Sequence, residues 1–199
     1  MNKIGLLGCG AIVLVVVVIC AMVVAGGYNS LVGADEGVKS AWSQVENVYQ
    51  RRADLIPNLV ATVKGVANFE KETYTAVTEA RAKVGQIKVS SDQLSDPAAI
   101  ARFQQAQGEL GSALSRLLVV SENYPELKAN QNFLDLQSQL EGTENRITTE
   151  RQKYNNVAQG YNTMRRRFPR NIVASLFGFK DKAYFTADAG SNKAPEVKF

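Results

Sequence analysis

The stretch RRADLIPNLVATVKGV, residues 51–66, decides how the rest of the chain folds. Within it, Asp54 stands three residues before Pro57. Aspartate is a good N-cap, and proline is tolerated in the first turn of a helix, where its missing N–H costs no hydrogen bond. We therefore predict that one helix ends near Arg52, that a second begins after Asp54, and that the chain reverses direction between them.

An uncharged stretch, residues 4–27, precedes this region and has AIVLVVVVICAMVVA at its centre. A helix that crosses a bilayer needs about 20 apolar residues, and the apolar core of a cleavable signal peptide has only about 7–15. Cys9 precedes the apolar core, whereas a lipid-attachment cysteine would follow it. We predict a transmembrane anchor over 1–27 that contacts the lipid bilayer through 4–27, in a single-pass protein of the cell membrane. The few flanking charges leave the side of the soluble part open.

After the anchor, apolar residues recur at the three- and four-residue spacing of amphipathic helices, and Trp42 and Tyr49 fall on such a stripe. Asp96-Pro97 and Asn130 supply the capping chemistry for two further helices. No window is typical of a strand. We predict an all-α protein whose residues 28–168 form an antiparallel up-and-down four-helix bundle with long helices. The expected helices cover about 28–52, 55–87, 97–122 and 131–167.

The C-terminal part differs in charge from the rest of the chain. Residues 35–164 hold 14 basic and 16 acidic residues, whereas 165–199 hold 8 and 3. We predict a short basic and apolar helical segment over 169–185 and a disordered tail over 186–199. If four helices alternate in direction, the basic segment returns to the membrane. One small basic cluster on a slightly acidic domain gives no basis for a nucleic-acid partner.

Two interpretations of this C-terminal segment stay open. In the first, its arginines meet anionic headgroups while apolar side chains, Ile172 and Leu176 among them, enter the interface. In the second, the segment covers the open end of the bundle with its apolar face. The residues proposed for membrane-surface contact are Arg165, Arg166, Arg167, Arg170, Phe177 and Phe179.

The residue inventory argues against an enzyme. The chain has no histidine, and its two cysteines, Cys9 and Cys20, lie in the anchor. The commonest general base and the usual ligands of zinc and of di-iron bundle centres are therefore missing from the soluble part. No G-x-x-x-x-G-K phosphate loop occurs. We predict no catalytic residue, no cofactor and no metal.

Several polar residues lie next to apolar helix positions and could meet inside the bundle. Glu144 and Arg151 are seven residues apart and share one face of a helix. Such a network could form a ligand or ion site, or it could consist of ion pairs and caps that fix the register of the helices. The candidate residues are Arg52, Asp54, Asn58, Glu144, Arg151 and Asn155.

Five segments occur in one order that resembles a known family. They are YNSLV (28–32), AWSQVENVYQRRADLIPNLVATVKG (41–65), SENYPELKANQNFLDLQSQLEGTENRI (121–147), RQKYNNVAQGYN (151–162) and FPRNIVASLFGF (168–179). This order resembles the LemA family of bacterial membrane-anchored proteins. The resemblance implies an N-terminal membrane helix followed by a four-helix-bundle domain, and it implies no established molecular activity.

Two functional hypotheses follow from the sequence. The first is a non-enzymatic, membrane-tethered helical module that binds another protein or organises a membrane, because long helices present extended faces to a partner. The alternative is a sensor or small-ligand-binding module that uses the interior polar residues.

Overall fold

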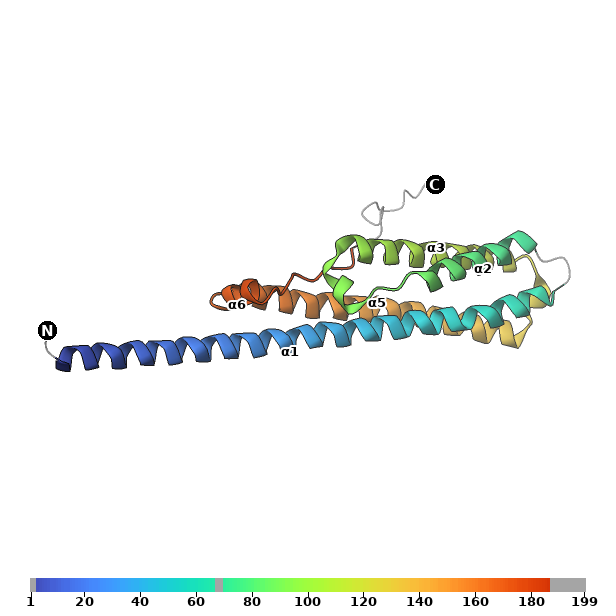
Figure 1. The fold of residues 1–199 in the computed structure, drawn as a ribbon. Helices are drawn as coiled ribbons and strands as arrows, with labels where there is room; N and C mark the ends of the chain where they lie inside the picture. Colours follow the sequence, from blue (N-terminus) through green and yellow to red (C-terminus); the bar gives the residue numbers. More distant parts are fainter. Residues whose placement is uncertain (1–2, 67–69, 187–199) are drawn as a thin grey trace, which may run out of the picture. The chain divides into compact units, whose positions relative to one another are not determined.

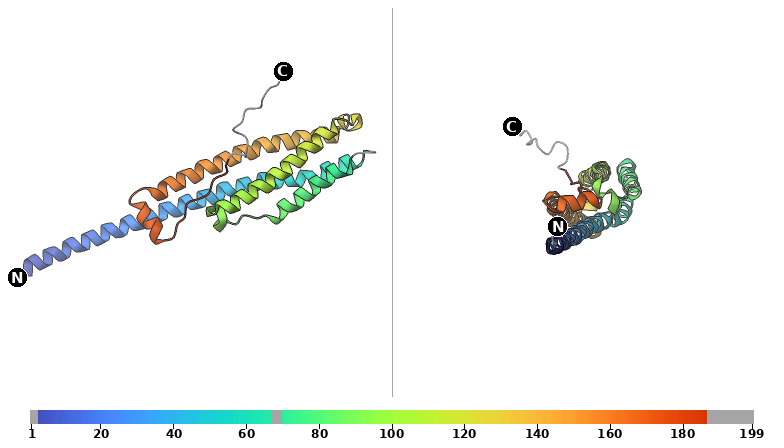
Figure 2. Two further views of the ribbon diagram at one scale, coloured as in Figure 1. Left: turned by 90° about the horizontal axis from the view of Figure 1, so that it is seen from above. Right: turned by 60° about the vertical axis from the view of Figure 1, so that its left-hand side comes forward.

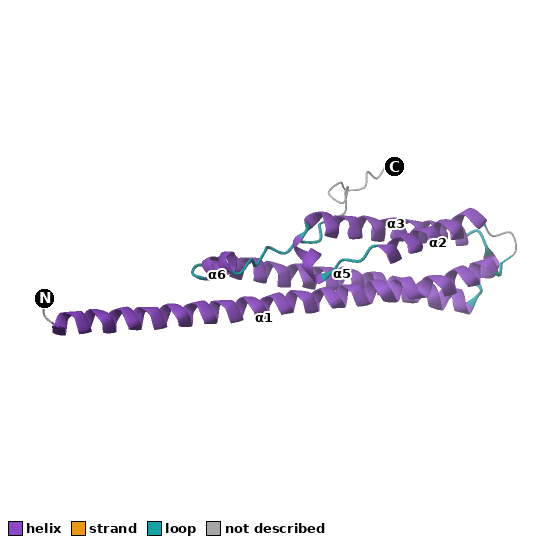
Figure 3. Cartoon of the chain, viewed as in Figure 1, coloured by secondary structure: helices purple, strands orange, loops and turns teal. Residues whose placement is uncertain are grey.

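The computed structural model of the chain describes residues 3–66 and 70–186. Over these ranges the chain forms six α-helices and one 3-10 helix, and no strand occurs in them (Figure 1, Figure 3). The all-α prediction is therefore confirmed. The elements are α1 (Lys3–Lys64), α2 (Lys71–Gln86), η1 (Ser91–Ser95), α3 (Pro97–Ser121), α4 (Pro125–Lys128), α5 (Gln131–Arg166) and α6 (Arg170–Leu176).

Helix α1 passes through Pro57 without ending, so the predicted break at Asp54–Pro57 is wrong. Proline has no N–H to donate to the carbonyl four residues earlier, that of Ala53. Arg81 of α2 takes the place of this donor, because its Nε–H bonds to the Ala53 carbonyl oxygen at 2.9 Å. Asp54 is not a cap, and its exposed carboxylate accepts a hydrogen bond from the Gln50 amide at 2.7 Å. The first link between helices thus follows Lys64.

Arg81 is expected to stabilise the chain mainly because Pro57 is there. Arg81→Ala should cost about 1 kcal/mol of unfolding free energy, since the Ala53 carbonyl then loses its donor. In the Pro57→Ala background the new backbone N–H serves that carbonyl, and the same change should cost less than about 0.5 kcal/mol. Urea unfolding of the full-length protein in detergent micelles measures this double-mutant cycle. Additive effects of the two substitutions would contradict the assignment.

The capping predictions further along the chain are confirmed. The Asp96 carboxylate accepts the Ala98 N–H at 2.9 Å, with Pro97 in the first position of α3. The Asn130 side-chain oxygen accepts the Phe133 N–H at 3.2 Å at the start of α5. The loops on either side of α3 contain η1 and α4, which the sequence did not predict. Caps are local chemistry, which explains why they were predictable.

The chain divides into two compact units, and both combine segments that are distant in sequence. We name the unit that contains residues 3–40 and 156–182 the anchor unit. The unit that contains residues 41–66, 70–155 and 183–186 is the core unit. The predicted domains, with limits at 27 and 168, were continuous in sequence, whereas α1 and α5 contribute to both compact units.

The core unit is held together by apolar side chains from five helices, and α2 lies beside α3 in both views (Figure 1, Figure 2). Trp42 and Tyr49 are buried as predicted. Full burial of one leucine, isoleucine or phenylalanine is worth about 1.5–3 kcal/mol. The central cluster is therefore the main source of stability. It contains Ile56, Leu59 and Val63 of α1, Val77 and Ala80 of α2, Leu110, Leu114 and Leu117 of α3, Leu127 of α4, and Phe133 and Leu140 of α5.

In the anchor unit, α6 packs against α1. Leu31 is buried with Val173 and Ala174 of α6. A Cβ atom at Gly27 would lie 3.2 Å from Val173 Cγ2, so the missing side chain allows the close approach. Helix α6 ends two residues before Gly178, which has a φ of 74°, a left-handed conformation that glycine adopts without strain.

The first part of α1 is apolar and uncovered. Every residue from Ala11 to Gly26 is exposed. Among the described residues, one helix is long and apolar enough to cross a membrane, and it is α1. An apolar helix of the protein core would be buried, whereas this segment is exposed. Its length and composition are those of a membrane anchor.

Candidate functional site

A buried arginine connects three helices of the core unit. Arg52 of α1 is only 3% exposed. Its Nη1 donates to the Glu144 carboxylate of α5 at 2.9 Å. Its Nη2 donates to both the backbone carbonyl, at 3.1 Å, and the side-chain oxygen of Gln107 of α3. The guanidinium also lies over the Tyr49 ring, 5.1 Å from its centroid. The three hydrogen bonds fix the position of α1 relative to α3 and α5.

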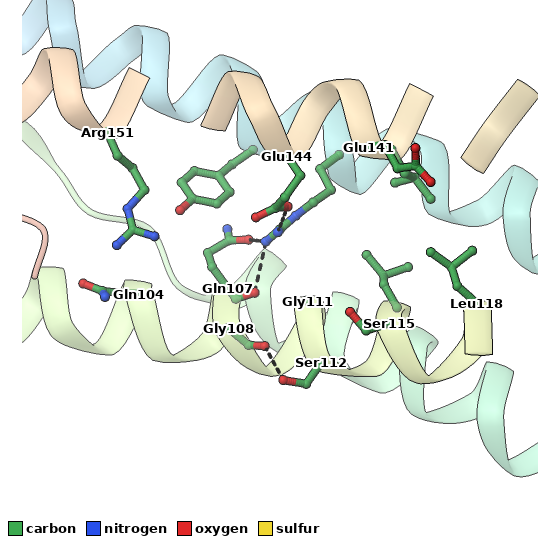
Figure 4. A pocket seen from close by; sticks show the side chains of 14 residues that line it. Gln104, Gln107, Gly108, Gly111, Ser112, Ser115, Leu118, Glu141, Glu144 and Arg151 are labelled. Carbon is green, nitrogen blue, oxygen red and sulfur yellow. Dashed lines mark hydrogen bonds and ion pairs between the residues drawn. The ribbon is translucent and has the colours of Figure 1, made fainter. Parts of the chain in front are cut away.

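A hollow of about 650 Å³ lies beside this arginine. Figure 4 shows Glu144 and Arg151 on one wall and Gln104 and Gln107 on the other. Arg52 lines the hollow too, and its buried Nε–H has no hydrogen-bond partner among the described residues. The hollow therefore has the size and the polar groups to hold a small polar molecule.

The structure brings some of the predicted polar residues together and separates others. Arg52 and Glu144 form an ion pair. Arg151 lines the same hollow, but its guanidinium donates to the Thr186 carbonyl at 3.1 Å and lies over the Phe185 ring. Asp54 and Asn58 are exposed and do not line this hollow.

Two asparagines hold the C-terminal segment: Asn155 was a candidate for the interior polar network but not for this role, and Asn162 was not predicted at all. In the core unit, the Asn155 side chain donates to the Phe185 carbonyl and accepts the Phe185 N–H, both at 2.9 Å. In the anchor unit, Asn162 forms the same pair of bonds with Lys182, at 2.9 and 2.8 Å. A signal was present, because Tyr-Asn recurs at 154–155 and 161–162, one heptad apart on a single helix face.

The C-terminal segment ends differently from the prediction. Thr186, which was assigned to the disordered tail, bonds through its backbone to Gln104 and Arg151 in the core unit. Residues 187–199, the remainder of that predicted tail, lie outside the described residues.

Asp35 and Lys182 form a largely buried ion pair in the anchor unit, with 2.6 Å between Oδ1 and Nζ. Lys39 contacts the other carboxylate oxygen at 3.0 Å. Burial raises the pKa of Asp35, but hydrogen bonds from Lys182 and Lys39 and their charges outweigh it and hold this pKa below its usual value. Lys182 also lies over the ring of Tyr161, and burial raises the pKa of that phenol to about 12.

Asp35→Asn should destabilise the protein by about 2 kcal/mol at pH 6, because it leaves Lys182 buried without its counter-ion. A carboxyl whose folded pKa is lowered stabilises the fold above its unfolded pKa, about 3.9, and loses this effect as pH falls through the lower folded value. The cost of the substitution should therefore shrink on acidification to pH 3. Urea unfolding in micelles at the two pH values measures it. Asp135→Asn, on an exposed residue, is the control, and an Asp35→Asn cost that does not change with pH would contradict the prediction.

The four arginines predicted for membrane contact fall into two pairs. Arg165 donates to the Phe179 carbonyl at 2.7 Å and pairs with Asp181 at 3.0 Å. Arg166 pairs with the same carboxylate at 2.9 Å, and its hydrogen bond lowers the pKa of Asp181 more than burial raises it. Arg167 and Arg170 instead line an open hollow of about 400 Å³.

The two predicted phenylalanines also differ. Phe177 is 51% exposed, whereas Phe179 is partly buried against the Leu31 cluster. Both rings contact Tyr28, with centroids 4.8 and 5.8 Å away. Phe179 thus contributes to the packing of the anchor unit, whereas about half of the Phe177 side chain stays exposed.

Comparison with known proteins places the chain in a family. The LemA family profile matches residues 41–199. Magnetosome protein MamQ 2 of Paramagnetospirillum magneticum is 30% identical over 174 residues, which cover 79% of this chain and 64% of that protein. Protein LemA of Metamycoplasma hominis is 26% identical over 162 residues, 81% of this chain and 70% of that protein. The chain thus spans just under two thirds of the length of the magnetosome relative. The chain belongs to the LemA family.

Proposed function

We propose that the protein is a non-enzymatic, single-pass helical module of the cell membrane that docks another protein or organises the membrane. The observation that carries this proposal is the continuity of α1. One helix includes both the exposed apolar residues 11–26 and the apolar residues of the core unit. A bilayer would cover the exposed part, where a helix satisfies its own backbone hydrogen bonds. The soluble part would then be joined to the membrane without a flexible linker.

We infer further that the core unit is an antiparallel up-and-down four-helix bundle. Pairs of interacting residues support this arrangement. As the residue number on α1 increases, the number of its partner on α2 or α5 decreases, and the number of its partner on α3 increases. Such a bundle presents long helical faces on which a partner can dock. The pairs are Ala53–Arg81 and Lys64–Tyr74 for α2, Trp42–Tyr154 and Arg52–Glu144 for α5, and Trp42–Phe103 and Arg52–Gln107 for α3.

We also propose that α6 lies at the bilayer surface. It packs on α1 at Gly27, the last residue of the predicted anchor. Val173 and Ala174 fill the packing face, as the capping interpretation requires. Four large apolar side chains nevertheless point away from the protein, and exposed apolar surface next to an anchor favours insertion into the interface. They are Phe168 (80% exposed), Ile172 (59%), Leu176 (72%) and Phe177 (51%).

Crosslinking of the full-length chain in native membranes tests the docking function. We expect crosslinks from lysines of the core unit, such as Lys83 and Lys128, to one recurring membrane or membrane-bound protein. The same crosslinking after detergent solubilisation and gel filtration is the control for collisions in the membrane. Recovery of the chain only as an uncrosslinked monomer, at crosslinker concentrations that trap known neighbours, would contradict the proposal.

A second candidate function is small-ligand binding, and the unpartnered Nε–H of Arg52 beside the hollow favours it. A ligand that binds only the folded protein raises its melting temperature by mass action. Thermal shift of the full-length protein with a panel of metabolites and ions should find such a ligand. Ser115→Phe fills the hollow from an exposed position and should abolish the shift. A shift of the same size in this variant would place the ligand elsewhere.

A further inference from the structure

The anchor unit has two arginines whose charge is not neutralised within the described protein. Asp181 pairs with Arg165 and Arg166. The side chains of Arg167 and Arg170 have no ion-pair or hydrogen-bond partner among residues 11–66 and 70–186. Both arginines line the same open hollow, together with the polar residues Asn156, Gln159 and Thr163. Two unpaired guanidinium groups in one hollow create a site for an anion.

The position of this hollow relative to the anchor indicates the source of the anion. The Cγ atom of Arg170 lies 3.9 Å from where a Cβ atom on Gly27 would stand. Gly27 is the last residue of the predicted anchor, and the first charge on α1 beyond it, Asp35, follows eight residues later. At 1.5 Å per residue this is about 12 Å along the helix. If residues 4–27 span a bilayer, Arg170 and the hollow that it lines therefore lie near the depth of the bilayer phosphates.

Polar groups, the two arginines and exposed apolar side chains occur here in the same order as the headgroup, the phosphate and the acyl chains of a phospholipid. In the anchor unit, α5 approaches the apolar stretch as its numbers rise, because Gly37 is near Val157 and Leu31 is near Met164. Amide and hydroxyl groups of the hollow thus lie farther from the apolar stretch, beyond the arginines. Ile172 and Leu176 are exposed apolar side chains of α6, and α6 packs on Gly27 at the end of the predicted anchor through Val173.

We propose that Arg167 and Arg170 bind the phosphate of one anionic phospholipid, whose polar headgroup occupies the hollow and whose acyl chains lie along α6. This inference rests on the proposed function, since a lipid reaches the hollow only if residues 4–27 hold the chain in a bilayer. The guanidinium fork binds phosphate oxygens in pairs, and a basic residue near an anionic membrane surface strengthens binding on the order of fivefold. The site is specific to this pair and does not include Arg165 and Arg166.

Quenching by brominated lipids tests the site in the full-length chain. The reporter is Ile172→Trp on α6, in the Trp42→Phe background so that it is the sole tryptophan. The protein is reconstituted in vesicles of phosphatidylcholine and phosphatidylglycerol in which one or the other lipid carries bromine. We expect an apparent preference for phosphatidylglycerol on the order of fivefold, and a fall to near onefold in Arg167→Gln/Arg170→Gln.

A charge-matched control separates the site from the general attraction of a basic segment. Arg166→Gln/Lys180→Gln removes the same two charges from exposed residues of the same unit that do not line the hollow. It should keep more than half of the preference. An equal loss in both double variants would overturn the site and leave only diffuse electrostatic attraction.

Two further outcomes separate the inference from the proposal on which it rests. Quenching of equal strength by both lipids would place α6 at the bilayer, as proposed, and overturn the lipid site. No quenching by either lipid would overturn the position of α6 at the bilayer itself. Inorganic phosphate that abolishes the preference at constant ionic strength would assign the arginines to a free anion instead of a lipid.

Discussion

Trp42→Ala is expected to lower the unfolding free energy of the protein by about 4 kcal/mol, in the range measured for large aromatic residues in protein cores. Trp42 is 3% exposed. Its ring contacts Phe103 of α3 and Tyr154 of α5, with centroids 5.3 and 5.5 Å away. It also stacks on Phe185 of the C-terminal segment at 5.7 Å. One truncation therefore removes the ring contacts that Trp42 makes with two helices and with the segment that follows α6.

Trp42→Phe is the informative companion. The indole Nε1–H is buried and has no hydrogen-bond partner among the described residues, so phenylalanine removes a donor that is costly to bury. We expect a loss of only about 1 kcal/mol, from the smaller ring. Urea unfolding of the full-length protein in micelles measures both variants, with Val119→Ala, at a residue that is 65% exposed, as the control.

The C-terminal segment supplies a second readout for Trp42→Ala. Loss of the stacking partner of Phe185 should release residues 183–186, so their amides should exchange with solvent at least tenfold faster, an effect that corresponds to about 1.4 kcal/mol. Unchanged exchange there, or equal destabilisation by the alanine and phenylalanine variants, would show that the aromatic cluster does not hold the segment in place.

Features that depend on residues close together in the sequence could be predicted, and features that depend on distant residues could not. Caps at Asp96 and Asn130 were predictable because the capping side chain and the backbone N–H that donates to it are two or three positions apart. The same rules were misleading at Pro57, because Arg81 lies 24 residues further along and supplies the missing hydrogen bond. A tertiary contact can thus cancel a local signal that would otherwise end a helix.

The candidate sites were only partly predictable for a related reason. A helical face can be deduced from spacing, and Glu144 and Arg151 do line one hollow. Which partner each side chain selects depends on contacts across the fold: Arg151 bonds to Thr186, and Gln107 receives the hydrogen bonds of Arg52. Likewise, the run of arginines gives no sign in the sequence that Asp181 pairs with Arg165 and Arg166 and not with Arg167 or Arg170.

Arg52→Ala is expected to cost about 3 kcal/mol of unfolding free energy. The substitution removes the only hydrogen bond that the buried Gln107 side-chain oxygen accepts among the described residues, and also the guanidinium that lies over the Tyr49 ring. An unsatisfied buried acceptor alone costs about 1–3 kcal/mol, and the lost packing adds to it. The loss should depend little on salt, because hydrogen bonds to the amide of Gln107 are not screened as surface charges are.

Glu144→Ala separates the ion pair from the rest of the Arg52 contacts. The Glu144 side chain is 59% exposed, and an ion pair with such a solvated carboxylate contributes at most about 1 kcal/mol. Its loss should shrink further when NaCl is raised from about 0.1 M to 1 M, over which the screening length falls about threefold. Urea unfolding at the two salt concentrations distinguishes the variants. If Glu144→Ala costs as much as Arg52→Ala, the charge pair and not the bond to Gln107 holds the three helices together. A ligand anion that displaces Glu144 from Arg52 would then weaken the core unit instead of stabilising it.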